Sequence, residues 1–409
     1  MTTNYTEQGG DLDEVYASKD FIMDAYPDLL PAMTLPGLWT WGQGSSGQLG
    51  QGALTDRSSP VTTAGGGYTW KTVSISTTGA AIKNDGTLWT WGNNGSGQIG
   101  DGTTTQRTSP VTTAGGGTNW KQARSALDGN MMVAVKTDGT LWTWGIGNWG
   151  ALGEGSAPGG AAPSGVRSSP GTTLGGGTNW KQGASSGYHC SAVKTDGTLW
   201  SWGYNASGQL GDGTVTSSRS PITTVGAITN WVSVDTGGIA GPGFTAGITS
   251  DGRLWTWGDG TSGKLGTGST ANRSSPGTTA GGGTTWKKAA CGDDFMGAIK
   301  TDGTLWTWGV NTNGQLGNGN ATNRSSPGTT AGGGTNWKDI AIGRNLGIGL
   351  KTDGTLWAWG YNAYGNAGDG TTANVRSSPI SIAGGGTNWK VVPDGMGESS
   401  AAISELGNW

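Results

Sequence analysis

The chain is poor in the residues that usually build a chemical site. Its 409 residues include one histidine, two cysteines and three phenylalanines, and only 12% of them are charged. The single histidine, His189, excludes metal sites built from several histidines and argues against a Ser–His catalytic triad. Cys190 and Cys291 have neither a redox nor a zinc-binding spacing, so we expect two buried thiols. The sequence therefore predicts no enzyme, no cofactor and no metal site.

Strong charge and long apolar segments are also missing. The net charge of −3 gives no support to binding of nucleic acid or of an anionic membrane. No stretch approaches the 18 or so apolar residues of a membrane span, and residues 1–11 lack the basic and apolar regions of a secretory leader. We therefore expect a soluble protein that binds no nucleic acid and does not insert into a membrane.

Glycine and tryptophan are abundant instead, with 83 and 23 copies, and both follow an internal repeat. The phrase Leu-Trp-x-Trp-Gly occurs seven times, and its second tryptophan falls at Trp41, Trp91, Trp144, Trp202, Trp257, Trp308 and Trp359. A period near fifty residues indicates a repeat architecture whose units stack to bury a shared core. One array of repeats is therefore expected rather than two or three unrelated domains.

Each repeat has the pattern of four antiparallel strands. In one copy, Trp120–Ala123 begins a first strand and Met132–Lys136 forms a second. Thr137–Thr140 is a tight Asp-Gly turn, and Leu141–Trp144 is a third strand. Arg167–Pro170 leads into a fourth, whose proline suits an outer edge that needs no ladder N–H. Four such strands repeated radially predict the blades of a β-propeller.

The seventh copy is divided between the two ends of the chain. Six copies keep the Asp-Gly turn, at Asp85, Asp138, Asp196, Asp251, Asp302 and Asp353. The strand Gly37–Trp41 lacks upstream partners, and Trp389–Val392 and Ala401–Ser404 lack downstream ones. Joining them makes a composite blade and removes exposed sheet edges. We therefore predict an all-β fold, a seven-bladed β-propeller over residues 37–409 with a composite closing blade.

Residues 1–36 stand outside the repeat and are acidic. They hold seven acidic residues against Lys19, a net charge of −6, which leaves +3 for the rest of the chain. Ser18 is placed to cap a short helix that ends at Ala25. This arm is either a strap packed on the propeller or a docking arm for a larger assembly. In the second interpretation the candidate docking residues are Val15, Tyr16, Phe21, Ile22 and Tyr26.

The segment Asp85–Gly102 reads Asp-Gly-Thr-Leu-Trp-Thr-Trp-Gly-Asn-Asn-Gly-Ser-Gly-Gln-Ile-Gly-Asp-Gly and resembles the regulator of chromosome condensation repeat. The resemblance covers about residues 37–404 and implies a seven-bladed propeller. The near-identity of the copies is similar to bacterial and bacteriophage members, and Asp11–Phe21 is similar to the leader of repeat proteins encoded by phages of marine bacteria. Nucleotide exchange on a small GTPase, the founder's activity, is not implied, because it depends on a basic tail and loops that have no counterpart here.

Comparison of the copies singles out one end of the propeller. The Asp-Gly turns and Gly-Gly-Gly crossovers are nearly invariant, whereas the loop between the first two strands differs in every copy: Ser76–Gly79, Ser125–Met131, Ser185–Cys190, Asp235–Gly243, Cys291–Met296, Ile342–Gly347 and Asp394–Glu398. Strand alternation places these loops at one end, together with the Gln-Leu-Gly loops and the long insertion Ser156–Val166.

Loops on a rigid scaffold commonly carry recognition, so a recognition face is predicted at that end. Its candidate residues are Trp149, Tyr188, His189, Asp293, Asp294, Phe295 and Arg344. The alternative is that unconstrained loops have simply drifted apart.

Two other patterns are weaker. Gly42–Gly47 fits the dinucleotide-binding spacing of glycines but opens no helix, so it lacks the phosphate-binding geometry. Asp293 and Asp294 could act as paired carboxylates, but sequence neighbours rarely aim at one point, and a solvated loop is expected.

These observations predict a non-enzymatic structural and recognition module. The expected setting is a bacteriophage virion, as a fibre, tail or capsid-surface component. Its arm would join other virion proteins, and the propeller would face a host surface glycan or protein. The alternative is a cytoplasmic regulator that binds a protein partner such as a small GTPase. A third option is a polysaccharide-active or lectin-like enzyme that uses exposed tryptophans.

Overall fold

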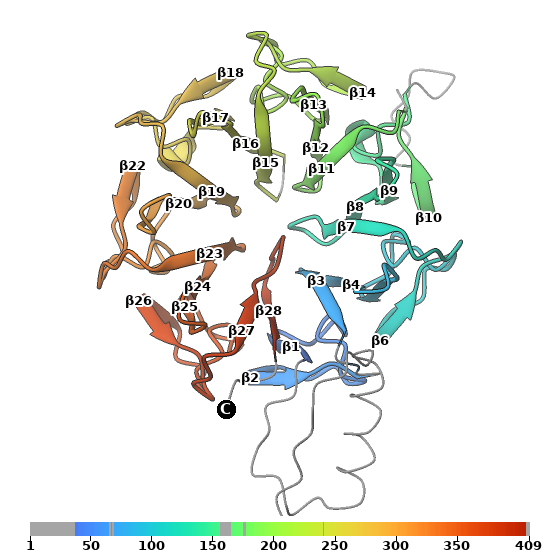
Figure 1. Cartoon of the computed structure of the whole chain (residues 1–409), viewed down its shortest axis with the longest axis vertical. Helices are drawn as coiled ribbons and strands as arrows, with labels where there is room; N and C mark the ends of the chain where they lie inside the picture. Colours follow the sequence, from blue (N-terminus) through green and yellow to red (C-terminus); the bar gives the residue numbers. More distant parts are fainter. Residues whose placement is uncertain are drawn as a thin grey trace, which may run out of the picture.

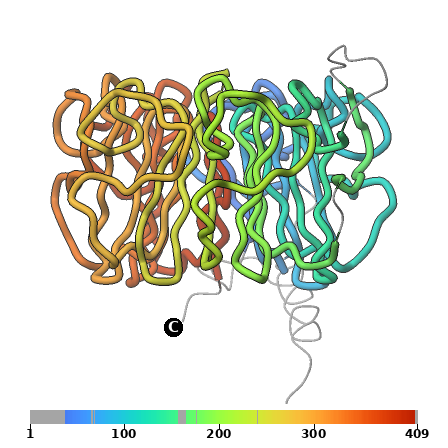
Figure 2. The backbone as a smooth tube through the Cα atoms, turned by 90° about the horizontal axis from the view of Figure 1, so that it is seen from above, coloured from blue at the N-terminus to red at the C-terminus, as the bar shows by residue number. Residues whose placement is uncertain are grey.

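The computed structural model describes residues 37–405, apart from positions 65, 66, 68, 156–164, 175, 176 and 240. The strands form seven four-stranded antiparallel sheets arranged radially around a central axis (Figure 1). Figure 2 shows the resulting disc edge-on, with the strands running between its two ends. The predicted seven-bladed propeller is confirmed. The arm at residues 1–36, with its expected helix and docking residues, lies outside the described residues, as does most of the insertion Ser156–Val166.

Six blades are continuous in sequence, and we number them along the chain. Blade 1 contains β3 (Trp70–Ile75), β4 (Thr78–Lys83), β5 (Leu88–Gly92) and β6 (Arg107–Thr112), counted outward from the axis. Blades 2 and 3 repeat this order in β7 (Trp120–Ser125), β8 (Met131–Lys136), β9 (Leu141–Ile146) and β10 (Val166–Thr172), then β11 (Trp180–Ser185), β12 (His189–Lys194), β13 (Leu199–Gly203) and β14 (Ser218–Thr223).

The remaining blades follow the same order. Blade 4 contains β15 (Trp231–Gly237), β16 (Phe244–Thr249), β17 (Leu254–Gly258) and β18 (Arg273–Thr278). Blade 5 contains β19 (Trp286–Cys291), β20 (Phe295–Lys300), β21 (Leu305–Gly309) and β22 (Arg324–Thr329). Blade 6 contains β23 (Trp337–Ile342), β24 (Leu346–Lys351), β25 (Leu356–Tyr361) and β26 (Val375–Ser381). Blade 7 is the composite one, with β27 (Trp389–Val391), β28 (Ser399–Ser404), β1 (Gly37–Gly42) and β2 (Arg57–Thr62).

The Asp-Gly turns form as the sequence predicts. In blade 1, the N–H and the hydroxyl of Thr87 donate to Asp85 Oδ1 at 2.8 and 2.7 Å. Gly86 follows with a φ of +81°, a left-handed conformation that glycine adopts without strain. The carboxylate thus satisfies the backbone of its own hairpin. The four residues Asn84–Thr87 thus connect the second and third strands of the blade.

The second tryptophan of each repeat ties its blade to the preceding one. Trp144 is fully buried, and its Nε1 donates to the backbone oxygen of Gln98, in the loop of blade 1, at 2.9 Å. Gly100 must be small there, because its φ is +74° and a Cβ would lie 2.6 Å from the Trp144 ring nitrogen. Equivalent bonds run from Trp41 to Asn366, Trp91 to Gln48, Trp202 to Ala151, Trp257 to Gln209, Trp308 to Lys264 and Trp359 to Gln315.

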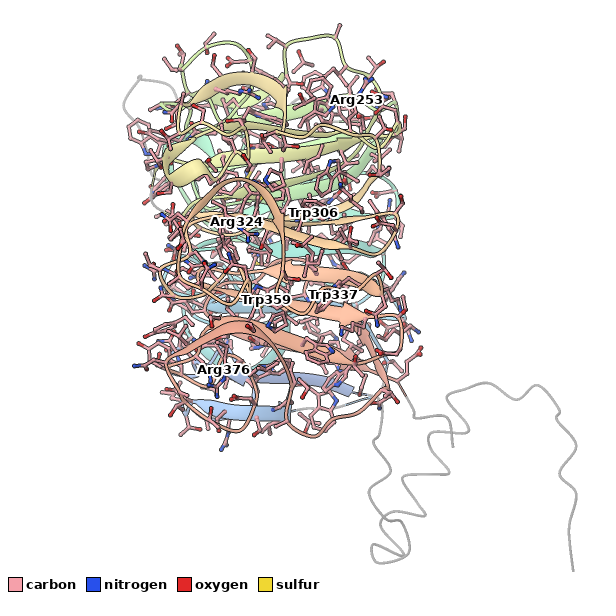
Figure 3. The ribbon with its side chains drawn as sticks, turned by 90° about the vertical axis from the view of Figure 1, so that its left-hand side faces the viewer. Arg253, Trp306, Arg324, Trp337, Trp359 and Arg376 are labelled. Atoms are coloured by element: carbon pink, nitrogen blue, oxygen red, sulfur yellow. The ribbon has the colours of Figure 1, made fainter. Side chains whose placement is uncertain are left out.

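The core lies between blades rather than inside any one of them. Trp120 packs against Trp142 and Trp144 of its own blade, with ring centroids 5.9 and 6.0 Å apart, and against Ile82 and Leu88 of blade 1. Figure 3 shows the corresponding neighbours Trp337 and Trp359 in blade 6. Because each blade covers the apolar face of the one before it, no blade has a complete core alone.

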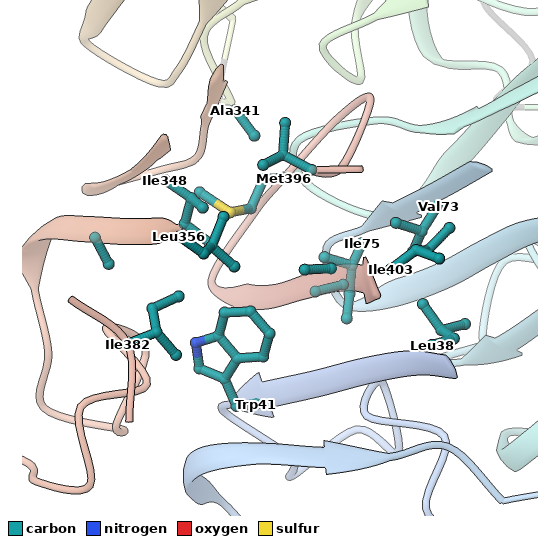
Figure 4. Packing of buried hydrophobic residues seen from close by; sticks show 14 of the residues in the cluster. Leu38, Trp41, Val73, Ile75, Ala341, Ile348, Leu356, Ile382, Met396 and Ile403 are labelled. Atoms are coloured by element: carbon teal, nitrogen blue, oxygen red, sulfur yellow. The ribbon is translucent and has the colours of Figure 1, made fainter. Parts of the chain in front are cut away.

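The composite blade closes the ring. Strand β1 pairs antiparallel with β28, from Gly37 opposite Ser404 to Gly42 opposite Ser399. Trp41 projects from β1 into a cluster with Ile382 and Leu356 of blade 6 (Figure 4). On the other side, Ile75 N–H of blade 1 donates to the backbone oxygen of Gly395 at 2.9 Å. Both neighbours of blade 7 are therefore held, as the split repeat predicts.

Candidate recognition face

The two ends of the disc carry different connections. The first strand of each blade runs away from the Asp-Gly turns, so the first-to-second-strand loops gather at the opposite end, and the third-to-fourth-strand loops begin there. We call this the variable end. The turn end carries the Asp-Gly turns and the crossovers between blades. The structure thus places the seven loops that differ between copies at one end, as strand alternation predicts.

A row of charged side chains crosses the variable end over blades 4 to 7. Lys264 Nζ lies 2.6 Å from Asp294 Oδ1 and 2.6 Å from Asp259 Oδ2. Arg344 Nε lies 3.7 Å from Asp293 Oδ2, and the Arg344 guanidinium also pairs with Glu398. We call these six residues, Asp259, Lys264, Asp293, Asp294, Arg344 and Glu398, the charged row. Three predicted face residues, Asp293, Asp294 and Arg344, therefore lie together.

The electrostatics of the charged row follow from its partners. Burial would lower the pKa of Lys264, but hydrogen bonds to Asp259 and Asp294 raise it overall. The hydrogen bond to Glu398 raises the pKa of Arg344. Burial, together with the nearby charge of Asp294, raises the pKa of Asp293. Both cations of the charged row are thus held in their charged forms.

The adjacent acids Asp293 and Asp294 form no paired-carboxylate site. Asp294 faces Lys264, whereas Asp293 accepts the Ile239 N–H at 2.8 Å and lies near Arg344. General acid–base catalysis by two carboxylates requires both to reach one substrate atom or its water. The two carboxylates serve as contacts between neighbouring loops.

Two aromatic pairs also lie at the variable end. Trp149, in the short 3₁₀ turn Asn148–Gly150, is 52% exposed, and its ring lies 5.0 Å from that of Tyr204. Tyr364 is 37% exposed and lies 6.1 Å from Tyr361. Tyr361 and Tyr364 line a pocket of about 30 Å³ with Arg344 and Glu398. Exposed aromatic rings beside arginine are typical of protein-binding surfaces.

Trp149 and Tyr188 are positioned by backbone contacts. Trp149 has a φ of +58°, a conformation that non-glycine residues adopt rarely. Tyr188 is half-buried, and its backbone oxygen accepts the Tyr204 N–H at 2.8 Å. Tyr204 therefore connects the two predicted face residues, one through its ring and one through its backbone.

Two predicted face residues lie inside the fold instead. His189 is fully buried, with its ring nitrogens 2.8 Å from Ser186 Oγ and 3.0 Å from Thr245 Oγ1. Burial lowers the pKa of His189 to about 3, so the ring is neutral. Phe295 is also buried and belongs to the cluster of Trp337 and Ile342. The sequence predicted both residues in surface loops, and this prediction is corrected. Each is the first residue of a second strand, β12 or β20, and its side chain already points into the core.

A polar network fills the central channel. A cavity of about 210 Å³ lies among the first strands and is lined by Arg124, Gln182, Asp235, Lys288 and Asp394, among others. Arg124 and Asp235 pair at 2.6 Å, and Lys288 lies 3.1 Å from Asp339. These charges satisfy one another. Among the described residues, no group of three or more metal-binding side chains occurs.

The sequence reasoning missed several residues of this face. Lys264 and Asp259 form a buried ion pair beneath it, and Tyr204, Tyr361 and Tyr364 add three aromatic rings to it. A signal for Lys264 was present in the repeats, since the equivalent residue is glutamine in four other copies, at Gln48, Gln98, Gln209 and Gln315. The remaining two copies have Ala151 and Asn366 at this position, so Lys264 is the one charged residue among the seven equivalents.

Comparisons with family models agree with this architecture. A model described as RCC1-like domain matches residues 32–331, and one described as regulator of chromosome condensation (RCC1) repeat matches residues 337–366. Within the part of the chain that the structure describes, no helix is long and apolar enough to cross a membrane.

Curated relatives match the chain over part of their length. The ultraviolet-B receptor UVR8 of Arabidopsis thaliana is 30% identical over 272 residues, which are 63% of this chain and 59% of the receptor. The E3 ubiquitin-protein ligase HERC2 of Homo sapiens is 28% identical over 247 residues, 58% of this chain and 5% of the ligase. The chain thus spans less than two thirds of either relative.

Solved structures match it almost end to end. Prp20p from Saccharomyces cerevisiae, described with its binding to Gsp1p and histones, has a TM-score of 0.76 at 17% identity and covers 94% of this chain and 95% of its own. Human WBSCR16 has a TM-score of 0.76 at 18% identity, covering 90% of this chain and 99% of its own. At such identities these similarities establish the fold alone.

Proposed function

The chain belongs to the RCC1-like domain family, and on that premise we propose that it is a non-enzymatic recognition module that binds a protein partner through its variable end. The observation that carries this proposal is the coincidence of three features there. The loops that differ between copies, the exposed aromatic pairs and the charged row all lie at the same end. The turn end, by contrast, repeats nearly the same connections in every blade.

The physical properties of the face suit a protein partner. Trp149 and Tyr364 offer large rings with few rotatable bonds, and Arg344 offers a planar donor group beside Tyr364. Such residues dominate the binding energy of protein interfaces, because they bury much area at a small entropic cost. The charged row provides both signs of charge, which favours one orientation of a partner over others.

A protein partner also fits the family better than the virion role expected from the sequence. The relatives described above come from a plant, a yeast and human, and none is a virus protein. Prp20p is described as binding the proteins Gsp1p and histones. A cellular regulator with a protein partner, such as a small GTPase, is therefore the setting that we propose.

The test compares two matched double variants. Trp149→Ala with Arg344→Ala removes an exposed apolar ring and an exposed cation from the variable end. Leu174→Ala with Arg253→Ala removes an exposed aliphatic side chain and an exposed cation elsewhere, at a crossover and in an Asp-Gly turn. A partner enriched from the source cells on the purified wild-type chain is identified by mass spectrometry and titrated against all three proteins by calorimetry.

We expect the first variant to bind at least about tenfold more weakly, which corresponds to about 1.4 kcal/mol, because it removes two interface anchors. The second variant should bind like the wild type. Loss of affinity in the second variant alone would place the binding surface at the turn end and contradict the proposal. If the partner is a phage structural protein, the virion role expected from the sequence would be favoured over the cellular one.

A further inference from the structure

The turn end carries a ring of lysines around the mouth of the central channel. The second residue of the first strand is a lysine in six blades, at Lys71, Lys121, Lys181, Lys287, Lys338 and Lys390. Blade 4 has Val232 at this position. All six lysines are exposed, and all lie on the innermost strands (Figure 1). We call these six residues the lysine ring.

A β-bulge repeated in every blade places these residues. In blade 1, Trp70 pairs with Lys83 and Thr72 with Ile82, so Lys71 has no partner in the register. The same shift follows the first tryptophan in all the other blades. A bulge turns the side chain of its extra residue out of the regular alternation. The lysines therefore stand at one level, one residue from the turn end of each first strand.

The positive charge of the lysine ring is largely uncompensated. Within the described residues, Lys390 pairs with Glu405, and the other five ring lysines have no ion pair. Lys181 donates to the backbone oxygen of Val232 in the next blade at 3.0 Å, which leaves its charge in place. Like charges gathered at a channel mouth repel each other and focus a positive potential there.

The acids of the turn end are engaged further from the axis. The six turn aspartates accept hydrogen bonds from their own hairpins, as Asp85 does from Thr87. A second set of lysines, Lys83, Lys136, Lys194, Lys300 and Lys351, ends the second strands and precedes five of these turns, with each ammonium over a pair of tryptophan rings. The aspartates and lysines of the hairpins compensate each other's charge. The hairpin aspartates therefore do not neutralise the lysine ring.

We propose that the lysine ring is a binding site for an acidic peptide and that residues 1–36 of the same chain occupy it. This segment has seven acidic residues against one lysine, a net charge of −6. It enters the propeller at Gly37, the first residue of β1, which pairs with Ser404 at the turn end. Charge and point of entry therefore both direct it to the lysine ring.

The distances are compatible with this occupant. Strand β1 is the third strand from the axis in blade 7, and neighbouring strands lie about 4.8 Å apart. An extended segment reaches about 3.3 Å per residue, so a few residues before Gly37 suffice to reach the mouth of the channel. Most of the segment, with the acids from Glu7 to Asp28, then remains to contact the lysines. The lysine ring lies at the end opposite the variable end, so its binding of residues 1–36 does not depend on a partner at the variable end.

Carbodiimide cross-linking of the full chain tests the contact directly, because it joins a carboxylate to an amine only where the two touch. An equal mixture of unlabelled and ¹⁵N-labelled protein separates links within one chain from links between chains. We expect links within one chain from the acids of residues 1–36 to the lysine ring. They should fade in about 1 M salt, where the Debye length is about 3 Å.

A pair of charge-matched variants adds a second readout. Lys71→Gln, Lys121→Gln and Lys338→Gln together weaken the lysine ring, whereas Arg57→Gln, Arg273→Gln and Arg324→Gln remove the same charge from the outer strands β2, β18 and β22. Thermal unfolding establishes that both variants fold. A glutamate-specific protease should cut at Glu7 and Glu14 at least about tenfold faster in the first variant, since a released segment loses its protection.

Three results would overturn the proposal. Links only between chains would assign the acidic segment to a second copy. Links confined to lysines such as Lys83 would place it away from the channel mouth. Equal cleavage of the wild type and both folded variants would show that the lysine ring does not hold the segment.

Discussion

Arg124 and Asp235 pair at 2.6 Å across the central channel, although their strands, β7 and β15, are separated by a whole blade. Both side chains are about nine-tenths shielded from solvent. Asp235 also accepts the Cys291 N–H at 2.8 Å and the Thr236 N–H at 2.9 Å. One carboxylate therefore joins blades 2, 4 and 5. The propeller is held together by contacts across its axis as well as by contacts between adjacent blades.

This geometry predicts that Arg124→Met destabilises the fold by about 3–5 kcal/mol, because Asp235 is left buried without its cation. Adding Asp235→Asn to that variant should recover much of the loss, since the orphaned charge is removed. Denaturant unfolding of the wild type, the single variant and the double variant measures both effects. A double variant even less stable than Arg124→Met would show that the pair itself, rather than the buried charge, dominates.

The two kinds of tryptophan predict unequal costs of truncation. Trp144→Ala should cost about 3–5 kcal/mol, because it empties a buried site and removes the hydrogen bond to Gln98. Trp149→Ala should change stability by about 0.5 kcal/mol or less, because the side chain is mostly exposed. The free energies of unfolding of the two variants provide the comparison. Equal losses would contradict the assignment of Trp149 to an exposed face.

Ring closure predicts a strong effect at the C-terminal end. Deleting Ser399–Trp409 removes β28, so β1 loses the partner that it pairs with from Gly37 to Gly42. The exposed edge should aggregate, and the thermal transition should broaden as cooperativity falls. Deleting residues 406–409 alone leaves β28 intact and is the control. If the longer deletion unfolds as sharply as the control, β28 is not needed for closure.

The low pKa of the buried His189 predicts a specific loss of folding stability in acid. Its pKa is about 3 in the folded protein, below the ordinary 6.5, so the unfolded chain takes up the proton first as the pH falls. The stabilisation is present above pH 6.5 and is lost between pH 6.5 and 3, by about 2 kcal/mol at pH 5. His189→Gln should flatten this part of the pH profile of the unfolding free energy. Since His189 is the only histidine, an unchanged slope would contradict its burial as a neutral ring.

Asp128 predicts a pH effect of opposite sign. Burial raises the pKa of its carboxyl group to about 6, although the backbone and side-chain N–H groups of Asn130 partly oppose the shift. Its contribution to stability is thus present below about pH 4 and is lost as the pH rises through 6. Asp128→Asn should stabilise the protein by about 1–2 kcal/mol at pH 8 and have little effect at pH 4. Melting temperatures at the two pH values measure the difference, and an equal shift at both would exclude ionisation as the cause.

The sequence alone was sufficient for the number of blades, their strands and the closing of the ring. These features depend on short-range signals that recur along the chain, such as the Asp-Gly turn at Asp85 and the alternation of Trp89 and Trp91 with Leu88 and Thr90, and on the one copy split between Gly37 and Ser404. Strand alternation also placed the variable loops at one end. Such features can be predicted from the sequence because each turn or strand is determined mainly by residues within a few positions of it.

Only the tertiary structure decided which side chains meet. Arg124 and Asp235 are 111 positions apart, and Lys264 reaches Asp294 from the loop of another blade. No spacing in the sequence predicts either ion pair, because the strands and loops that carry the paired residues come together only when the ring of blades forms. The burial of His189 and Phe295 likewise depends on the neighbouring blade, and the repeated bulge determines that Lys71 and its equivalents surround the channel mouth. Repetition specifies the scaffold, whereas the contacts between blades determine the character of its two ends.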